Sequence, residues 1–189
     1  MIQRTFGNSD LKCSPIGFGT WAMSTTMYGD VDVDAISRAV NAAIDNGINL
    51  FDTAEVYGPY HAEEILGKAL GSRRDEIVLV SKVGFNYEGR RVTGMNSKYD
   101  NIIERTEGCL KRLGTDVIDL MLIHWRDHDT PLDETMKALL KLKEDGKIRH
   151  YGVSNFDIPM METCLEYGPL TANQVGYNIF DQRMDKEVL

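Results

Sequence analysis

Short runs of apolar residues alternate along the chain with longer segments in which apolar residues recur every three or four positions. The runs are typical of strands buried on both faces, and the spacing is typical of amphipathic helices. The predicted strands are 16–19, 48–52, 77–82, 117–123, 150–153 and 172–177. The predicted helices are 34–46, 61–70, one capped by Ser97, one opened by Pro131 and ended before Gly146, and 159–167, with a helix-like start near Met184.

Two of these helices have a well-defined apolar side, and two segments lie outside the alternation. The helix after Ser97 is expected to bury Ile103, Cys109, Leu110 and Leu113, and the helix after Pro131 is expected to bury Met136, Leu139, Leu140 and Leu142. Residues 5–6 and 11–13 flank four turn-forming residues and predict a small N-terminal hairpin. Residues 83–95 are predicted to be a long loop.

Regular alternation of strand and helix predicts parallel strands joined by right-handed crossovers, and so an α/β fold. The chain has 189 residues, 42% of them hydrophobic, which is enough for one domain with a substantial core. No repeat, linker or low-complexity stretch divides it. We therefore expect a single domain over residues 1–189.

Composition excludes several classes of partner. The formal net charge is −8 and no basic stripe is present, which argues against nucleic acid. Apolar runs are far shorter than a membrane span, and the N-terminus lacks the apolar core of a signal peptide. Cys13, Cys109 and Cys164 are widely spaced, so we expect reduced thiols in a cytoplasmic protein, with Cys109 buried on its helix.

Four residues suggest chemistry. Asp52, Lys82 and His124 each lie at, or just past, the end of a predicted strand, and Tyr57 follows closely in the loop after Asp52. In a barrel of parallel strands, side chains at the carboxyl ends converge on one mouth. Taken singly, each has a structural alternative: Tyr57 as a loop aromatic, Lys82 as a solvated strand end, Asp52 as a turn cap and His124 as a core histidine. Together they predict a site that donates a proton to a carbonyl oxygen.

At Asp52-Thr53-Ala54-Glu55-Val56-Tyr57-Gly58 the chain resembles an aldo-keto reductase. The resemblance continues, in the family's order, at Glu63-Glu64-Ile65-Leu66-Gly67, Leu110-Lys111-Arg112-Leu113-Gly114-Thr115-Asp116, Ile118-Asp119-Leu120, His124-Trp125, Gly146-Lys147-Ile148-Arg149, Gly152-Val153-Ser154-Asn155-Phe156, Gln174 and Tyr177-Asn178. It implies a TIM-type (β/α)8 barrel that reduces aldehydes and ketones with NADPH, or with NADH. Such a barrel needs about 250 residues. We therefore expect only about six of its eight strands here, in a C-terminally incomplete domain with an N-terminal hairpin.

The resemblance also implies a role for each of the four residues. Tyr57 would be the general acid, and Lys82 would lower the pKa of its phenol. Asp52 would hold Lys82 in place, and His124 would orient the carbonyl oxygen. A free phenol has a pKa of about 10 and is a poor proton donor at neutral pH, so a nearby ammonium would assist it.

By the same resemblance, Ser154, Asn155 and Gln174 would bind the nicotinamide carboxamide, although a Ser-Asn helix cap is the alternative for the first two. The cofactor-binding prediction also includes Thr20, Trp21 and Asp52. The substrate pocket would be formed by Trp21, Trp125, Tyr57 and His124, with Met23 and Tyr28 as weaker candidates. Rim packing is the alternative for the tryptophans.

Three further expectations concern metal binding, self-association and alternative functions. His124 and His128 do not predict a metal site, because their segment follows a strand and no third ligand cluster is evident. The unpaired edges of the first and sixth strands predict self-association of an incomplete barrel. Two alternatives to a reductase of small carbonyl compounds remain, a non-catalytic subunit that senses the cofactor and an inactive truncated fragment.

Overall fold

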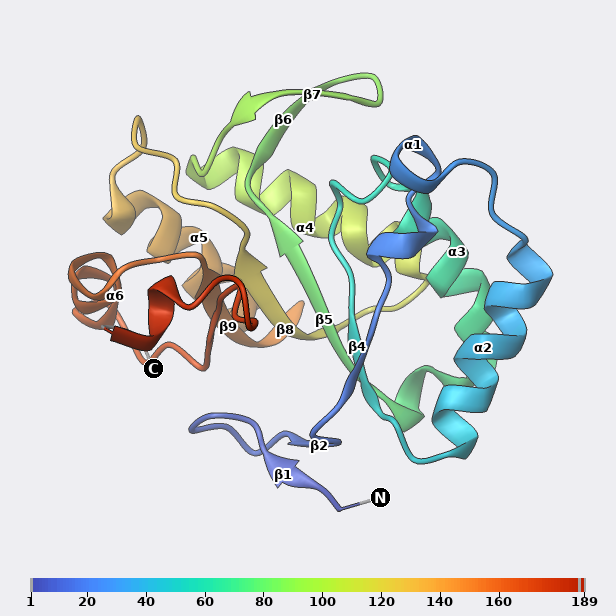
Figure 1. The fold of residues 1–189 in the computed structure, drawn as a ribbon. Coiled ribbons are helices and arrows are strands. Elements are labelled where there is room, and N and C mark those ends of the chain that lie inside the picture. The colour runs from blue at the N-terminus through green and yellow to red at the C-terminus, as the bar shows by residue number, and fades with distance from the viewer. Residues whose placement is uncertain (1, 187, 189) are drawn as a thin grey trace.

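A six-stranded parallel sheet forms the centre of the computed structural model, which describes residues 2–186 and 188 (Figure 1). Its strands are β3 (Gly17–Gly19), β4 (Leu50–Asp52), β5 (Val78–Val83), β8 (Ile118–Ile123), β9 (Ile148–Ser154) and β10 (Asn173–Gln174). Their order in the sheet is β10-β9-β8-β5-β4-β3. The predicted α/β class and the six strands of a partial TIM barrel are confirmed, although β10 is much shorter than residues 172–177.

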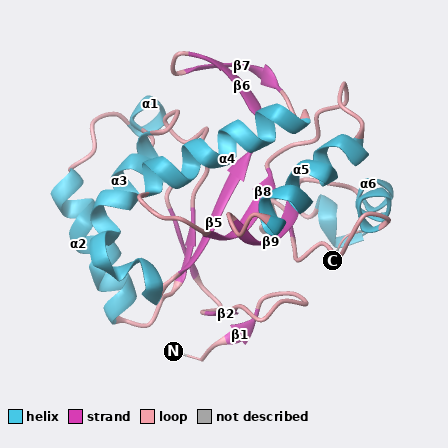
Figure 2. Cartoon of the chain, turned by 180° about the vertical axis from the view of Figure 1, so that it is seen from behind, coloured by secondary structure: helices cyan, strands magenta, loops and turns pink. Residues whose placement is uncertain are grey.

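The major helices lie along the outer face of the curled sheet (Figure 2). They are α2 (Val33–Asp45), α3 (His61–Leu70), α4 (Tyr99–Leu113), α5 (Leu132–Glu144) and α6 (Ile158–Leu165). The carboxylates of Asp32 and Asp157 cap α2 and α6 by accepting amide hydrogen bonds. Near Met184 the structure has a 3₁₀ turn, Arg183–Lys186, in place of the expected helix.

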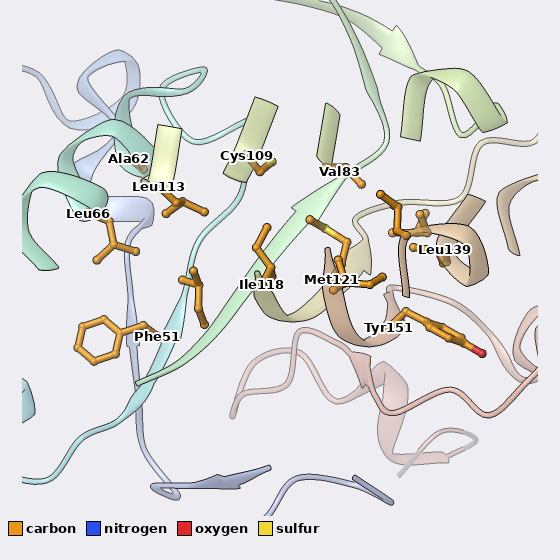
Figure 3. Close-up of a cluster of buried hydrophobic side chains, with 14 of the residues drawn as sticks. Phe51, Ala62, Leu66, Val83, Cys109, Leu113, Ile118, Met121, Leu139 and Tyr151 are labelled. Atoms are coloured by element: carbon orange, nitrogen blue, oxygen red, sulfur yellow. The ribbon is translucent and has the colours of Figure 1, made fainter. Parts of the chain in front are cut away.

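The larger core cluster lies between the sheet and these helices (Figure 3). Phe51, Leu66 and Met121 are fully buried there. Each buried side chain of this size contributes roughly 1.5–3 kcal/mol relative to an exposed one. Ile103 and Leu110 pack against the cluster from α4, as predicted.

One residue of α5 was assigned to the wrong side. Met136, Leu139 and Leu142 are buried as predicted, but Leu140 remains 36% exposed. Ala138 takes a buried position on α5 instead. Spacing alone placed Leu140 inward because it lies between Leu139 and Leu142, which are both buried.

The predicted N-terminal hairpin is present at the lower end of the sheet in Figure 1. It pairs β1 (Arg4–Thr5) with β2 (Lys12–Cys13) in antiparallel fashion. Side chains from this segment, including Leu11, join a smaller cluster on the inner face of β5 and β8. His150 Nε2 and Asp10 Oδ1 lie 2.7 Å apart, and this hydrogen bond holds the hairpin to β9. The hairpin therefore covers the end of the sheet opposite the carboxyl ends of the strands.

Residues 83–95 are not a loop, which corrects the prediction. They form a second antiparallel hairpin, β6 (Phe85–Glu88) and β7 (Arg91–Met95), with a bulge between Asn86 and Tyr87. This hairpin stands beyond the carboxyl end of β5 (Figure 1). Below, it is called the β6–β7 hairpin.

Ser97 does not cap α4, which also corrects the prediction. The N-cap position is Lys98 and makes no side-chain cap hydrogen bond. Instead, the Ser97 amide donates to Asp127 over 3.0 Å, and the Tyr99 amide donates to Glu134 over 2.9 Å. Carboxylates 30 and 35 residues away therefore accept hydrogen bonds from backbone amides at the start of α4.

In the described part of the chain, no helix is long and apolar enough to cross a membrane. Cys13, Cys109 and Cys164 are free thiols, and all three are buried. The predicted burial of Cys109 on α4 is confirmed.

Candidate active site

The ammonium of Lys82 is the centre of a buried polar cluster at the carboxyl ends of β4 and β5. Its Nζ donates to both carboxylate oxygens of Asp52, over 2.7 and 2.8 Å, and to the Thr53 carbonyl over 3.0 Å. It also lies 3.2 Å from the Tyr57 hydroxyl. Lys82 is only 2% exposed, and burial lowers its pKa while the Asp52 carboxylate opposes that shift. The predicted contact between these three side chains is present.

Tyr57 lies between two other aromatic rings. Its ring stacks on Trp21 at a centroid distance of 6.0 Å and meets the edge of His124 at 5.9 Å. Burial raises the pKa of Tyr57, and the Asp52 carboxylate adds to the increase. We had expected Lys82 to lower this pKa. The direction is the opposite, because burial and the Asp52 carboxylate both disfavour the phenolate.

His124 lies directly after β8 and faces the same space. Burial lowers its pKa to about 3, and the nearby Lys82 charge contributes. The imidazole is therefore neutral at physiological pH. Its Nδ1 is buried without a hydrogen-bond partner among the described residues. The backbone is fixed on both sides, since the His124 amide donates to Val83 and the His124 carbonyl accepts from Asn155.

Tyr57 and His124 both line a cavity of about 470 Å³. Trp21 and Trp125 also line it, as predicted, and are 53% and 44% exposed. The weaker candidates do not line it, since Met23 is buried in the core cluster and Tyr28 is 62% exposed.

Several wall residues of this cavity were not predicted. They are Ser24, Val56, Pro59, Phe85 and Val92. Phe85 and Val92 come from the β6–β7 hairpin, a segment predicted to be a loop. The motif places Val56 next to Tyr57, and Pro59 follows the motif directly. This proximity to Tyr57 is the signal that could have revealed both residues.

The predicted cofactor residues gather at the same mouth. Ser154 Oγ donates to the Gln174 carbonyl over 2.7 Å, and Asn155 Nδ2 lies 2.9 Å from Ser154 Oγ. Gln174 Nε2 donates to Asp52 over 3.2 Å. Thr20 Oγ1 is buried without a partner in the described part of the chain. Asn155 is not the N-cap of α6, because Asp157 takes that position.

Chemically, the cluster combines a phenol that retains its proton, a buried ammonium beside it and a neutral imidazole. The phenol and the imidazole line the cavity and are available to an oxygen atom entering it, while the ammonium lies behind the phenol. Amide and hydroxyl groups at the ends of β9 and β10 provide donors and acceptors that complement a carboxamide. The arrangement is therefore suited to binding a carbonyl oxygen and protonating it.

Comparison with known proteins supports a family assignment. Residues 15–189 match the sequence model of the Aldo/keto reductase family. The chain is 38% identical, over its full length, to "Aldo-keto reductase YhdN" of Bacillus subtilis. It is 35% identical, over 97% of its length, to the "NADH-specific methylglyoxal reductase" of Escherichia coli. It is also 35% identical, over 82% of its length, to a "Probable voltage-gated potassium channel subunit beta" of Arabidopsis thaliana.

Solved structures agree. The glycerol dehydrogenase AKR11B4 from Gluconobacter oxydans matches 99% of the chain with a TM-score of 0.91 and 38% identity. An aldo/keto reductase from Klebsiella pneumoniae, in complex with NADP and acetate, matches 97% with a TM-score of 0.81 and 35% identity. The chain spans 57%, 61% and 47% of the three curated relatives, and 58% and 61% of the two structures.

Proposed function

The chain belongs to the aldo/keto reductase family, and we propose that it reduces aldehydes or ketones to alcohols with a nicotinamide cofactor. The observation that carries this proposal is the contact of Tyr57 with Lys82 on a wall shared with His124. Tyr57 and His124 both line the cavity, and the ammonium lies 3.2 Å behind the phenol. A carbonyl oxygen near both side chains would accept one hydrogen bond from each.

The proton comes from Tyr57 in this proposal. Its raised pKa keeps the phenol protonated at rest, so that the proton is present when the substrate arrives. Negative charge develops on the carbonyl oxygen during reduction, and the phenol proton moves to that oxygen. The phenolate left behind is stabilised by Lys82, whose own charge is held by Asp52. His124 is neutral and donates a hydrogen bond to orient the oxygen.

The residues at the ends of β9 and β10 fit a nicotinamide. Asn155 and Gln174 offer side-chain amides, Ser154 offers a hydroxyl, and the buried Thr20 Oγ1 has no other partner among the described residues. We assign these four residues, with Trp21 and Asp52, to holding the cofactor. When bound, the cofactor supplies a hydride to the carbonyl carbon. Relatives named for NADP and for NADH leave the preference between the two open.

Replacement of Tyr57 by Phe tests the assignment. The variant removes one hydroxyl and preserves the ring that stacks on Trp21. We expect turnover of carbonyl substrates to fall by about 10²–10⁴-fold, the usual contribution of general acid catalysis. Cofactor affinity, followed by tryptophan fluorescence, should change little. Tyr167→Phe, which removes a hydroxyl far along the chain, is the matched control. Unchanged turnover in Tyr57→Phe would exclude Tyr57 as the acid.

A second candidate function is a non-catalytic subunit that binds the cofactor. The similarity to the Arabidopsis channel subunit favours it. Saturable cofactor binding, together with very slow transfer of hydride in a single turnover, would distinguish such a subunit from a reductase.

A further inference from the structure

Glu55 is a buried carboxyl group at the start of the turn that carries Tyr57. Its backbone is fixed, because its amide donates to the Lys82 carbonyl over 3.2 Å and its carbonyl accepts from the Tyr60 amide over 2.7 Å. The side chain is fully buried. Neither of its two oxygens has a hydrogen-bond partner among the described residues. The proton-donating reaction proposed above does not use this group.

The charged groups around Glu55 are bound to other residues. Glu63, on α3, accepts hydrogen bonds from Ser81 and from Arg112, each at 2.7 Å. Arg105, on α4, donates to the Tyr60 hydroxyl over 3.0 Å and also pairs with Glu104. Glu55 therefore has no counter-charge of its own.

The protonation state of Glu55 follows from this environment. Burial raises its pKa to about 8, and repulsion from Glu63 adds to the shift, while Arg105, Arg112 and the backbone amide of Phe85 oppose it. The other titratable groups that interact with Glu55 are Tyr60, Tyr87 and Cys109. All three are neutral at physiological pH, since burial raises the pKa of each. At neutral pH the carboxyl group is therefore protonated.

Two tyrosines next to Glu55 connect the Tyr57 turn to the β6–β7 hairpin. The rings of Tyr60 and Tyr87 lie 4.9 Å apart. The Arg112 guanidinium covers the Tyr60 ring at 4.3 Å, and the Arg105 guanidinium lies 5.5 Å from the Tyr87 ring. Tyr60 has a φ of +76°, which is rare for a bulky residue and requires support from its surroundings. The tilted contact between the two rings provides support and joins the two segments.

We propose that Glu55 is a positioning residue that carries a proton in the folded protein and thereby preserves the contact between Tyr60 and Tyr87. An ionised Glu55 would repel Glu63 and attract Arg105 away from the Tyr60 hydroxyl. The β6–β7 hairpin would then be held less firmly. This inference rests on the proposed function in one respect, since the hairpin supplies Phe85 and Val92 to the same cavity.

Hydrogen exchange of the hairpin amides tests the proposal without any measurement of activity. We would compare wild type, Glu55→Gln and Glu162→Gln at about pH 6.5 and about pH 9.5, on either side of the value of about 8. Glutamine preserves the shape of the neutral carboxyl group, and Glu162 is an exposed carboxylate. At the higher pH, residues 85–95 should exchange about tenfold faster in wild type and Glu162→Gln than in Glu55→Gln. At the lower pH the three proteins should agree.

Equal exchange in wild type and Glu55→Gln at the higher pH would overturn the proposal. If Glu55→Gln does not fold, the pH dependence of hydrogen exchange in wild type alone still tests the proposal. Exchange of the hairpin relative to β8, corrected for intrinsic rates, should then rise above about pH 8, and a constant ratio would contradict the proposal. The proposed reduction can fail independently, because Tyr57→Phe kinetics test it and these exchange rates do not.

Discussion

Gln174 Nε2 donates a hydrogen bond to Asp52 Oδ1 over 3.2 Å, although 122 residues separate the two in the chain. Three strands lie between β10 and β4 in the sheet order. The contact forms because the sheet curls and brings the carboxyl ends of β10 and β4 close together. Asp52 thereby joins the residue pair proposed for proton donation to the residues proposed for cofactor binding.

Gln174→Leu should weaken cofactor binding by about fivefold, since it removes the amide proposed to bind the carboxamide, and one hydrogen bond contributes about 1 kcal/mol. The measurement is a titration of NADPH followed by tryptophan fluorescence. Gln182→Leu, at an exposed position, controls for the loss of an amide elsewhere. An unchanged dissociation constant would contradict the assignment of Gln174.

Lys82→Met should abolish turnover and destabilise the fold by about 3 kcal/mol, because it leaves the Asp52 carboxylate without its counter-charge. The double variant Asp52→Leu with Lys82→Met should recover most of the stability and none of the turnover. Denaturant unfolding and steady-state kinetics measure the two effects. Recovery of activity in the double variant would show that the ion pair has no role in the reaction.

His124 predicts a pH profile without a histidine step. With its pKa lowered to about 3, the imidazole stays neutral in the folded state, while in the unfolded state it takes up a proton below about 6.5. The free energy of unfolding should therefore fall between these two values as the pH falls, by up to about 1.4 kcal/mol per pH unit. Turnover should stay flat from about pH 5 to about pH 7. His128→Gln, which replaces an exposed histidine, is the control and should leave both profiles unchanged. An inflection in turnover near pH 6.5 that is present in wild type and absent in His124→Gln would contradict a neutral His124 imidazole.

The open edges of the sheet predict self-association. β3 and β10 each pair on one side only, and Ile179 and Phe180 are 79% and 93% exposed. Sedimentation should show an average mass that rises with concentration, and Phe180→Ser should reduce the rise. A single monomeric boundary at every concentration, with cooperative unfolding, would contradict this prediction and the view of the chain as an unstable fragment.

The parts of the fold that local pattern controls could be predicted from the sequence. Apolar runs located β5 and β8 to within one residue, and helical spacing located α3 at both ends. The convergence of Asp52, Tyr57, Lys82 and His124 could also be predicted, because parallel strands place their carboxyl ends at one edge.

The remaining features depend on contacts between distant segments. In the β6–β7 hairpin the alternation of apolar and polar residues covers only the four residues of β6, and it is lost in β7. A bulge also interrupts the pairing of the two strands. The Ser97 amide donates its hydrogen bond to Asp127, a residue 30 positions away that local pattern does not connect to it. The motif does not predict the burial of Glu55, because that burial depends on α3, α4 and the hairpin together.

The sequential strand order has a consequence for how the chain is made. Each strand from β4 to β10 pairs with the strand synthesised just before it, leaving the two hairpins aside. The sheet can therefore grow unit by unit as the chain leaves the ribosome, without waiting for a distant partner. The N-terminal hairpin is the exception, because Asp10 must wait 140 residues for His150. The first segment to be synthesised is thus among the last to reach its final position.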